Sequence, residues 1–268
     1  ERDTQVTDKP KQVNEFVNTW SVEGFYEEGI APAELGWGTH EKTLPINAYQ
    51  HPDGPKNQIC IAQPGAKTWV RSWVPNMETT GMVIRHGEAF TISDHLTVWD
   101  KEKAVYRPTV HYAYCPTDAA VASMHELEMR QWDLTTNQRI MNEEIIDGDD
   151  RLGVLLMGHA YKSWWTGSLL NIHDSRKLIP KQSATTVQVA SAVYAAVAWA
   201  MANPNAGYRV PDDLPWREVL AFAEKYWGGY HSAAADWDPL MHRNDLYKGW
   251  NNRKYDESDP WQFSNFLV

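Results

Sequence analysis

The chain has 268 residues, of which 43% are hydrophobic, and a formal net charge of −10. This length allows one large domain or two smaller ones with a real hydrophobic core. The acidic balance argues against nucleic acid as a partner and favours cationic over anionic ligands. The charged first residues and an apolar run too short for a bilayer predict a cytoplasmic protein with no membrane partner.

The first half of the chain predicts helices and short strands in irregular alternation. The expected elements are a helix over 22–28 capped by Ser21, a loop in "ELGWGTHEKTLP", strands in "QICIAQ" and "TWVRSWV", a strand pair over 81–99, a strand over 107–114, and a helix from 117 to about 130. This mixture favours an α+β fold, with a mixed β-sheet and flanking helices, over strict strand–helix alternation.

The second half predicts a strand pair followed by helices. The expected elements are strands over 152–158 and 162–170 joined by a turn, a buried helix over 184–202, an amphipathic helix over about 213–226, and an irregular tail after 235. Two cysteines stand outside any metal-ligand or redox spacing. The sequence has no glycine-rich dinucleotide turn, Walker loop, HExxH or GxSxG motif, so neither a metal nor a serine nucleophile is expected.

The stretch "NTWSVEGFYEEG" mixes aromatic and acidic residues. Trp20 and Tyr26 offer aromatic faces, while Glu23, Glu27 and Glu28 offer negative charge. A cation gains stabilisation both from an indole face and from a carboxylate, so the pattern suits an organic amine. The alternative is an ordinary helix whose acids face solvent and whose aromatics face the core.

The stretch "RHGEAF" places His86 and Glu88 two residues apart. On a strand they would share one face, about 6–7 Å apart, with Arg85 on the other face. A histidine beside a glutamate can move protons near neutral pH, because the carboxylate raises the imidazole pKa and orients the ring. A local ion pair on an exposed strand is the alternative.

Several other aromatic and polar residues admit a role in a site. His111, Tyr112 and Tyr114 lie where a predicted strand runs into a helix, a common place for ligands, although aromatic packing is the favoured interpretation. Trp237 and Trp261 in the tail are expected to pack rather than to react. Fourteen tryptophans in 268 residues still leave room for a subset that lines a ligand site.

Six segments together resemble bacterial homospermidine synthase. They are "WSVEGFYEEGIAPAELGWGTHE", "AQPGAKTWVRSWVP", "GMVIRHGEAFTISDHLTVW", "YRPTVHYAYCPTDAA", "LGVLLMGHAYKSWWTGSLL" and "SDPWQFSNFLV". The resemblance runs over essentially the whole chain in the same order. It implies a saccharopine dehydrogenase-like fold, in which an NAD-binding Rossmann domain accompanies an α/β catalytic and dimerisation domain.

The resemblance also implies a reaction. Two molecules of putrescine are joined to homospermidine with release of ammonia, through imine intermediates, and the NAD cofactor takes up a hydride and returns it. A homodimer is the implied assembly. Among the site residues, the resemblance assigns a cation–π role to Trp20, amine binding to Glu1 and Glu28, and roles in catalysis to His86 and Glu88.

The Rossmann portion of that family has no counterpart in this sequence, and the cofactor-binding residues are therefore unknown. Residues 1–182 are expected to form the catalytic and dimerisation domain. Residues 183–268 are expected to form a helical segment that packs on a Rossmann domain absent from this chain. The chain is then a piece of a longer protein, the partner of a separate Rossmann-bearing chain, or a protein that has lost cofactor binding.

Two alternative functions remain open on the sequence. One is a non-catalytic remnant that binds diamines or polyamines. The other is a reductase of the saccharopine or carboxynorspermidine type, whose amino-acid substrates need a basic clamp for the carboxylate. Arg85 and Arg107 are the nearby candidates for such a clamp, whereas the other residues of these motifs are acidic.

Overall fold

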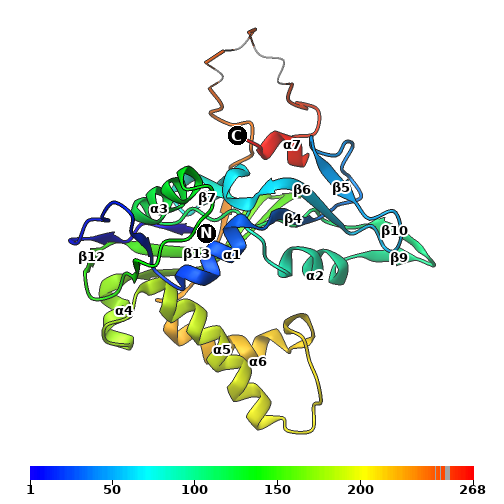
Figure 1. The fold of residues 1–268 in the computed structure, drawn as a ribbon. Coiled ribbons are helices and arrows are strands. Elements are labelled where there is room, and N and C mark those ends of the chain that lie inside the picture. Colours follow the sequence, from blue (N-terminus) through cyan, green and yellow to red (C-terminus); the bar gives the residue numbers. More distant parts are fainter. Residues whose placement is uncertain (245, 248, 251–253) are drawn as a thin grey trace. The chain divides into compact units, whose positions relative to one another are not determined.

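The computed structural model describes residues 1–244, 246–247, 249–250 and 254–268 (Figure 1). The chain forms two compact units that interleave along the sequence. Unit 1 comprises Glu1–Glu27, Cys115–Val154 and Thr166–Ser232, and unit 2 comprises Glu28–Tyr114, Leu155–Trp165 and Ala233–Val268. The predicted division into a domain over residues 1–182 and a segment over residues 183–268 stays a prediction.

Unit 1 contains short strands and most of the helices. Its elements are β1 (Arg2–Asp3), β2 (Val6–Thr7), β3 (Phe16–Asn18), α3 (Asp118–Met129), β11 (Gln138–Ile140), β12 (Ile145–Asp147), α4 (Ile172–Leu178), α5 (Ala184–Ala202), η2 (Pro211–Asp213), α6 (Trp216–Ala223) and η3 (Glu224–Tyr226). Strand β3 pairs with β11 in parallel, whereas β2 pairs with β12 antiparallel. The fold is therefore α+β with mixed strand pairing, as predicted.

Unit 2 is built mainly from antiparallel ribbons. Its elements are β4 (Pro32–Gly36), β5 (Ala48–Gln50), β6 (Gln58–Pro64), η1 (Gly65–Lys67), β7 (Trp69–Val74), β8 (Met77–Met82), α2 (Glu88–His95), β9 (Val98–Asp100), β10 (Lys103–Tyr106) and α7 (Phe263–Phe266). The sheet order β4-β6-β5 and the hairpins β7–β8 and β9–β10 organise it. Its core is a cluster of ten buried residues that includes Leu35, Ile59, Val83, Trp237 and Phe263.

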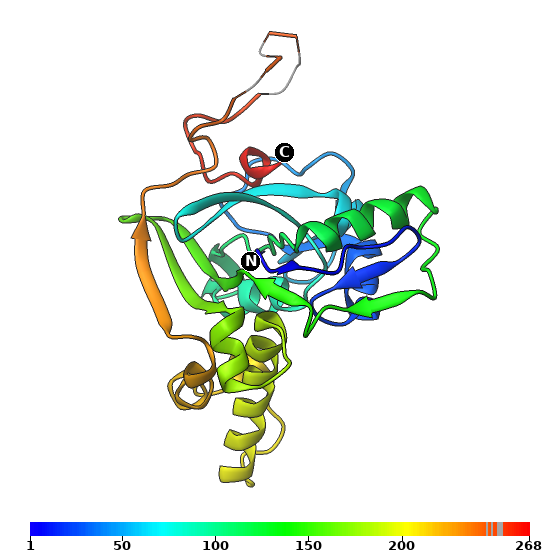
Figure 2. The same cartoon turned by 90° about the vertical axis from the view of Figure 1, so that its left-hand side faces the viewer.

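In four elements the chain passes from one unit to the other. They are α1 (Val22–Ile30), β13 (Asp149–His159), β14 (Lys162–Asn171) and β15 (Tyr230–Ala235). Strands β13 and β14 confirm the predicted strand pair. They belong to a sheet of order β1-β13-β14-β15, in which β15, the orange strand of Figure 2, is an edge that the sequence analysis did not predict.

Side-chain caps start the helices where the sequence predicts them. The Ser21 hydroxyl accepts a hydrogen bond from the Gly24 N–H (3.0 Å) at the start of α1. Thr117 caps α3 through the Ala120 N–H, and Ser183 caps α5 through the Thr186 N–H. These caps confirm the predicted helices over 22–28, over 117–130 and over 184–202.

Helix α5 is buried on one side only. Val187 and Ala195 are buried, whereas Val193 and Met201 are 62% and 78% exposed. The prediction of a buried helix is therefore only half right. Among the described residues α5 is the helix that could cross a membrane by length and composition, but 39% of its apolar window is buried in the protein, and core helices of soluble proteins also meet this criterion. Helix α6 lies beside it (Figure 1), and the Trp199 indole N–H donates to Glu218 (3.0 Å).

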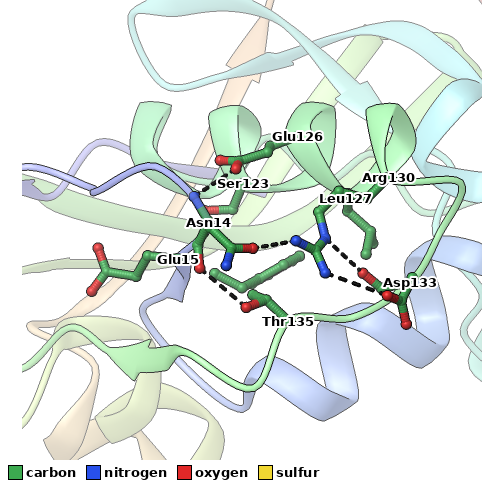
Figure 3. A pocket seen from close by; sticks show the side chains of 9 residues that line it. Asn14, Glu15, Ser123, Glu126, Leu127, Arg130, Asp133 and Thr135 are labelled. Atoms are coloured by element: carbon green, nitrogen blue, oxygen red, sulfur yellow. Dashed lines mark hydrogen bonds and ion pairs between the residues drawn. The ribbon is translucent and has the colours of Figure 1, made fainter.

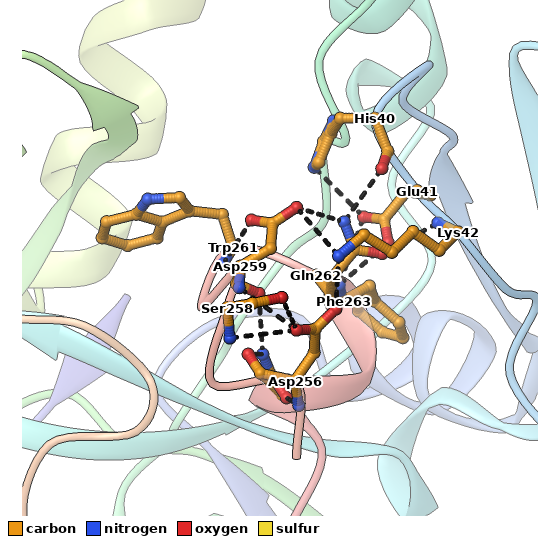
Figure 4. A network of polar contacts seen from close by, with 10 residues as sticks. His40, Glu41, Lys42, Asp256, Ser258, Asp259, Trp261, Gln262 and Phe263 are labelled. Carbon is orange, nitrogen blue, oxygen red and sulfur yellow. Dashed lines mark hydrogen bonds and ion pairs between the residues drawn. The ribbon is translucent and has the colours of Figure 1, made fainter.

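A polar network in unit 2 anchors the C-terminal tail (Figure 4). The buried Glu41 carboxylate accepts hydrogen bonds from the Phe263 N–H (3.0 Å) and the Thr109 hydroxyl (2.6 Å). Gln262 donates to the His40 carbonyl (2.9 Å). Burial raises the pKa of Glu41, while these hydrogen bonds oppose that rise. The end of the chain is thus fixed by hydrogen bonds, and Trp237 and Trp261 pack in or against the core of unit 2, as predicted.

Three predicted strands and a predicted loop differ from the structure. Only the two ends of residues 81–99 are strand, in β8 and β9, and helix α2 lies between them, because the small residues Ala89 and Ser93 are buried against Gly36 of β4. Residues 107–114 are extended but make only isolated bridges, at Val110 and Tyr114, with the described residues. The predicted loop that begins at Glu34 overlaps the end of β4, because Leu35 is a core residue.

Candidate functional site

His86 lies in the segment between β8 and α2. The preceding residues Val83 and Ile84 are fully buried, and the Val83 N–H donates to the Thr68 carbonyl (2.8 Å). The next N–H, of Arg85, donates to the Glu28 carbonyl (3.2 Å) at the end of α1. These contacts fix the backbone just before His86, so that its side chain, which is 25% exposed, is held near Glu28.

Both nitrogens of His86 face carboxylates. Nε2 lies 3.1 Å from Glu28 Oε2, and Nδ1 lies 3.4 Å from Glu88 Oε2. Burial alone would lower the pKa of His86, but the two carboxylates outweigh burial and raise the pKa to about 9. His86 also lowers the pKa of Glu88. At neutral pH the cluster therefore consists of an imidazolium between two carboxylates.

The expected strand geometry of His86 and Glu88 is wrong, although their pairing is correct. Gly87 precedes the first helical residue, Glu88, so the two side chains approach across the start of α2 rather than along a strand face. A carboxylate in the first turn of a helix is also favoured by the positive end of the helix dipole. The predicted rise in the pKa of His86 is confirmed in direction.

Tyr112 completes the surroundings of His86. Its ring stacks on the imidazole with a centroid distance of 4.2 Å and an interplanar angle of 13°. Sequence reasoning favoured plain aromatic packing for the segment of His111, Tyr112 and Tyr114. That holds for the buried Tyr114 and for His111, which contacts the rings of Phe263 and Phe266 edge-on. Tyr112, in contrast, contacts His86, which the alternating aromatic residues of this segment did not indicate.

The three glutamates of helix α1 have different surroundings. Phe25 is fully buried, whereas Glu23 and Glu27 are exposed to solvent. Of the three glutamates only Glu28 contacts His86, from the last turn of the helix. The last turn of a helix disfavours a carboxylate because the dipole is negative there. Glu28 is therefore placed against local preference, as is common for ligand-binding groups.

The two arginines considered as a carboxylate clamp are engaged elsewhere. Arg85 Nε lies 2.9 Å from Glu34 Oε2. Arg107 is almost fully buried, donates from Nε to the Thr97 hydroxyl (3.0 Å) and lies over the Trp99 ring. The cluster around His86 consequently presents negative charge, which suits an ammonium group better than a carboxylate.

Trp20 and Glu1 belong to unit 1. The Trp20 ring lies over Gly24, where an added Cβ would come within 2.9 Å of the indole, and 5.9 Å from the Phe25 ring. The backbone carbonyl of Glu1 accepts a hydrogen bond from the Cys115 N–H (3.0 Å). Unit 2 brings Glu28, His86 and Glu88 together, while a pocket shared with Trp20 and Glu1 stays a prediction.

Unit 1 also contains two buried carboxylates that sequence reasoning missed. Asp3 and Asp150 are opposite each other in strands β1 and β13, and both are fully buried. Asp3 accepts hydrogen bonds from the hydroxyls of Thr19 (2.6 Å) and Thr185 (3.2 Å). Burial, together with the charges of Glu1 and Asp3, raises the pKa of Asp150 well above its usual range. Nothing in the strand pattern distinguishes these acids from surface acids.

Unit 1 also has a cavity of about 210 Å³, which is lined by residues 2–7, Asp118 and Ala119. A small cavity in unit 1 has a volume of about 10 Å³, no more than one water molecule needs. Its polar lining is already engaged, since Arg130 contacts Asn14 and Asp133 (Figure 3). Within the described part of the chain, no three His, Cys, Asp or Glu side chains are arranged to hold a metal ion.

Comparison with known proteins agrees with the resemblance seen in the sequence. Residues 3–227 match the saccharopine dehydrogenase C-terminal domain. The chain is 48% identical to the homospermidine synthase of Blastochloris viridis and 46% identical to that of Mesorhizobium japonicum over 271 aligned residues. All of this chain is covered, but only 56% and 55% of those proteins, so the chain spans little more than half their length.

A solved structure gives the same result. The crystal structure of the homospermidine synthase from Legionella pneumophila in complex with NAD matches with a TM-score of 0.95 and 41% identity. The match covers the whole of this chain and 57% of that protein. The α+β fold of the C-terminal part of such an enzyme is thereby confirmed.

Proposed function

We propose that this chain, which belongs to the saccharopine dehydrogenase C-terminal domain family, is the catalytic part of an NAD-dependent homospermidine synthase. The enzyme would join two putrescine molecules and release ammonia. The observation that carries the proposal is the imidazole of His86 held between Glu28 and Glu88. This cluster suits a diammonium substrate whose amines must lose protons before they can react.

The cofactor would be held mainly outside these 268 residues. The sequence has no glycine-rich turn that could cradle a dinucleotide phosphate. We therefore assign NAD to a Rossmann portion, covalently joined or on a separate chain, and no residue of this chain to cofactor binding. When bound, the nicotinamide supplies the acceptor and donor of hydride. What this chain adds is the recognition of amines and the movement of protons.

Glu28 is proposed to bind an ammonium group of putrescine. Glu28 Oε2, which faces His86, is buried from solvent, so an ammonium would approach the other oxygen, Oε1, and compete with the imidazolium of His86 for the charge of this carboxylate. As the ammonium takes over the charge of Glu28, the pKa of His86 falls and His86 releases a proton to solvent, so that it can next accept a proton from a substrate amine. Glu88 retains the contact with Nδ1 and orients the ring.

Trp20 and Glu1 are proposed to act on the cationic substrate as the family resemblance implies. A protonated imine carries its charge on a carbon–nitrogen unit, which an indole face stabilises without reacting with it. We further propose a cytoplasmic homodimer, in which residues 183–268 pack on the Rossmann portion.

The two alternatives make different demands on the site. A carboxylate-binding reductase needs a free basic clamp, but Arg85 is paired with Glu34 and Arg107 is buried. A module that only binds diamines needs the carboxylates but no proton-transfer group. The histidine between two carboxylates therefore favours the synthase over both alternatives.

The test is a product assay on the native assembly, which includes the Rossmann portion, with putrescine deuterated on the carbons next to nitrogen and in the presence of NAD⁺. We expect homospermidine and ammonia in equal amounts, with the label retained and no net NADH. Tight binding of putrescine without product would favour the binding module, and net oxidation of NADH with an amino-acid substrate would favour the reductase. The mass of the native assembly shows whether a Rossmann-bearing portion accompanies the chain.

A further inference from the structure

Three contacts define the position of the His86 imidazole within unit 2, and they constrain different motions. The contacts of Nε2 with Glu28 and of Nδ1 with Glu88 act at the edge of the ring. They set how the ring is turned within its own plane. The stack on Tyr112, at 4.2 Å and 13°, acts on the face of the ring and sets the plane itself.

The contacts at the ring edge do not persist equally during the proposed reaction. Glu28 is the proposed ammonium ligand, so its contact with Nε2 is weakened when a substrate binds. Glu88 remains, but its side chain is 61% exposed and its contact with Nδ1 is the longer of the two. An exposed single ion pair holds a side chain weakly. The Tyr112 stack does not involve Glu28 and is therefore not weakened.

We infer that Tyr112 is a positioning residue that keeps the His86 ring plane fixed while the substrate amine takes over the charge of Glu28. This inference rests on the proposed function of Glu28. Tyr112 acts on His86 in two ways. Its ring blocks motion of the imidazole toward the stacked face, and this aromatic face stabilises the charged form of the imidazole, as aromatic faces do for cations. The aromatic ring of Tyr112 carries both effects.

The stack can be observed without any reaction. In the unsubstituted protein we expect NOEs between the ring protons of Tyr112 and those of His86, and an upfield shift of the His86 Hε1 resonance caused by the tyrosine ring current. Tyr112→Leu should abolish both the NOEs and the upfield shift, and should lower the titration midpoint of His86. Tyr112→Phe should retain the upfield shift and leave the midpoint nearly unchanged. Absence of the NOEs in the unsubstituted protein would overturn the inference, even if no variant folds.

Kinetics provide the second arm. Tyr112→Leu should lower kcat about tenfold or more with a smaller change in KM, because binding at Glu28 survives while the ring that moves the proton is misplaced. Tyr112→Phe should restore most of the rate. Tyr49→Leu is the matched control, because Tyr49 is 67% exposed in the same unit and is expected to have no effect. Equal kcat for Tyr112→Leu and the unsubstituted protein would overturn the inference.

The two arms separate this inference from the proposed function. If the unsubstituted protein, assembled with its Rossmann portion, makes no homospermidine, the proposed function fails, while the NMR arm still supports or overturns the positioning of His86 by Tyr112. If product forms and the NMR arm shows no stack, the inference fails and the proposed function stands.

Discussion

Glu28→Gln should lower the pKa of His86 while leaving the shape of the site unchanged. The rise in the pKa of His86 from 6.5 to about 9 corresponds to about 3 kcal/mol in favour of the imidazolium. Glu28 is expected to supply the larger part, because its contact is shorter (3.1 against 3.4 Å) and its side chain is 27% exposed, against 61% for Glu88. We therefore expect the titration midpoint to move down by about one to two pH units.

The assay is an NMR titration of the His86 Hε1 resonance, assigned by its loss in His86→Gln. Glu27→Gln is the matched control, because it removes the same charge from the neighbouring, exposed position of α1 and should leave the midpoint in place. Glutamine can still accept a hydrogen bond, so the shift isolates the effect of the charge. An equal midpoint in Glu28→Gln and Glu27→Gln would refute the electrostatic reasoning about this site.

Three further predictions concern Trp20, the packing of Gly36 and the pH dependence of stability. Trp20→Ala should lower turnover about tenfold or more while the melting temperature changes little, since the indole is partly exposed; equal loss of both would argue for a purely structural role. Gly36→Ala should destabilise the fold by about 2 kcal/mol or more in denaturant unfolding, because its Cβ would lie 2.3 Å from the Ala89 carbonyl oxygen; normal stability would show that α2 can move away from β4. The pKa of His86 is raised by folding, so its ion pairs should contribute stability that is complete below pH 6.5 and lost as the pH rises through about 9; unfolding measured across this range in His86→Gln should lack that component.

Elements with strong local signals could be predicted from the sequence. Helices α1, α3 and α5 follow their capping residues, and the β13–β14 pair follows two apolar runs around a turn. The segment 81–99 could not be predicted, because its alternating residues favour a strand whereas Ala89 and Ser93 pack against β4. Packing against a distant strand outweighed local preference there.

The site was predicted in part, and partly for the wrong reason. Glu28, His86 and Glu88 were selected through the family resemblance, and the structure brings them together in unit 2. The strand spacing invoked for His86 and Glu88 does not exist. Tyr112 was missed because its stack on His86 joins residues 26 positions apart, and Asp150 because its burial depends on the sheet and on α5. Neither the Tyr112 stack nor the burial of Asp150 leaves a local pattern in the sequence.

Calorimetric titration of putrescine tests the role of Glu28 most directly. We predict that Glu28→Gln weakens binding about tenfold or more, the loss expected for one charge-assisted hydrogen bond, while Glu27→Gln binds like the unsubstituted protein. Equal affinities for all three proteins would contradict the claim that Glu28 holds an amine of the substrate.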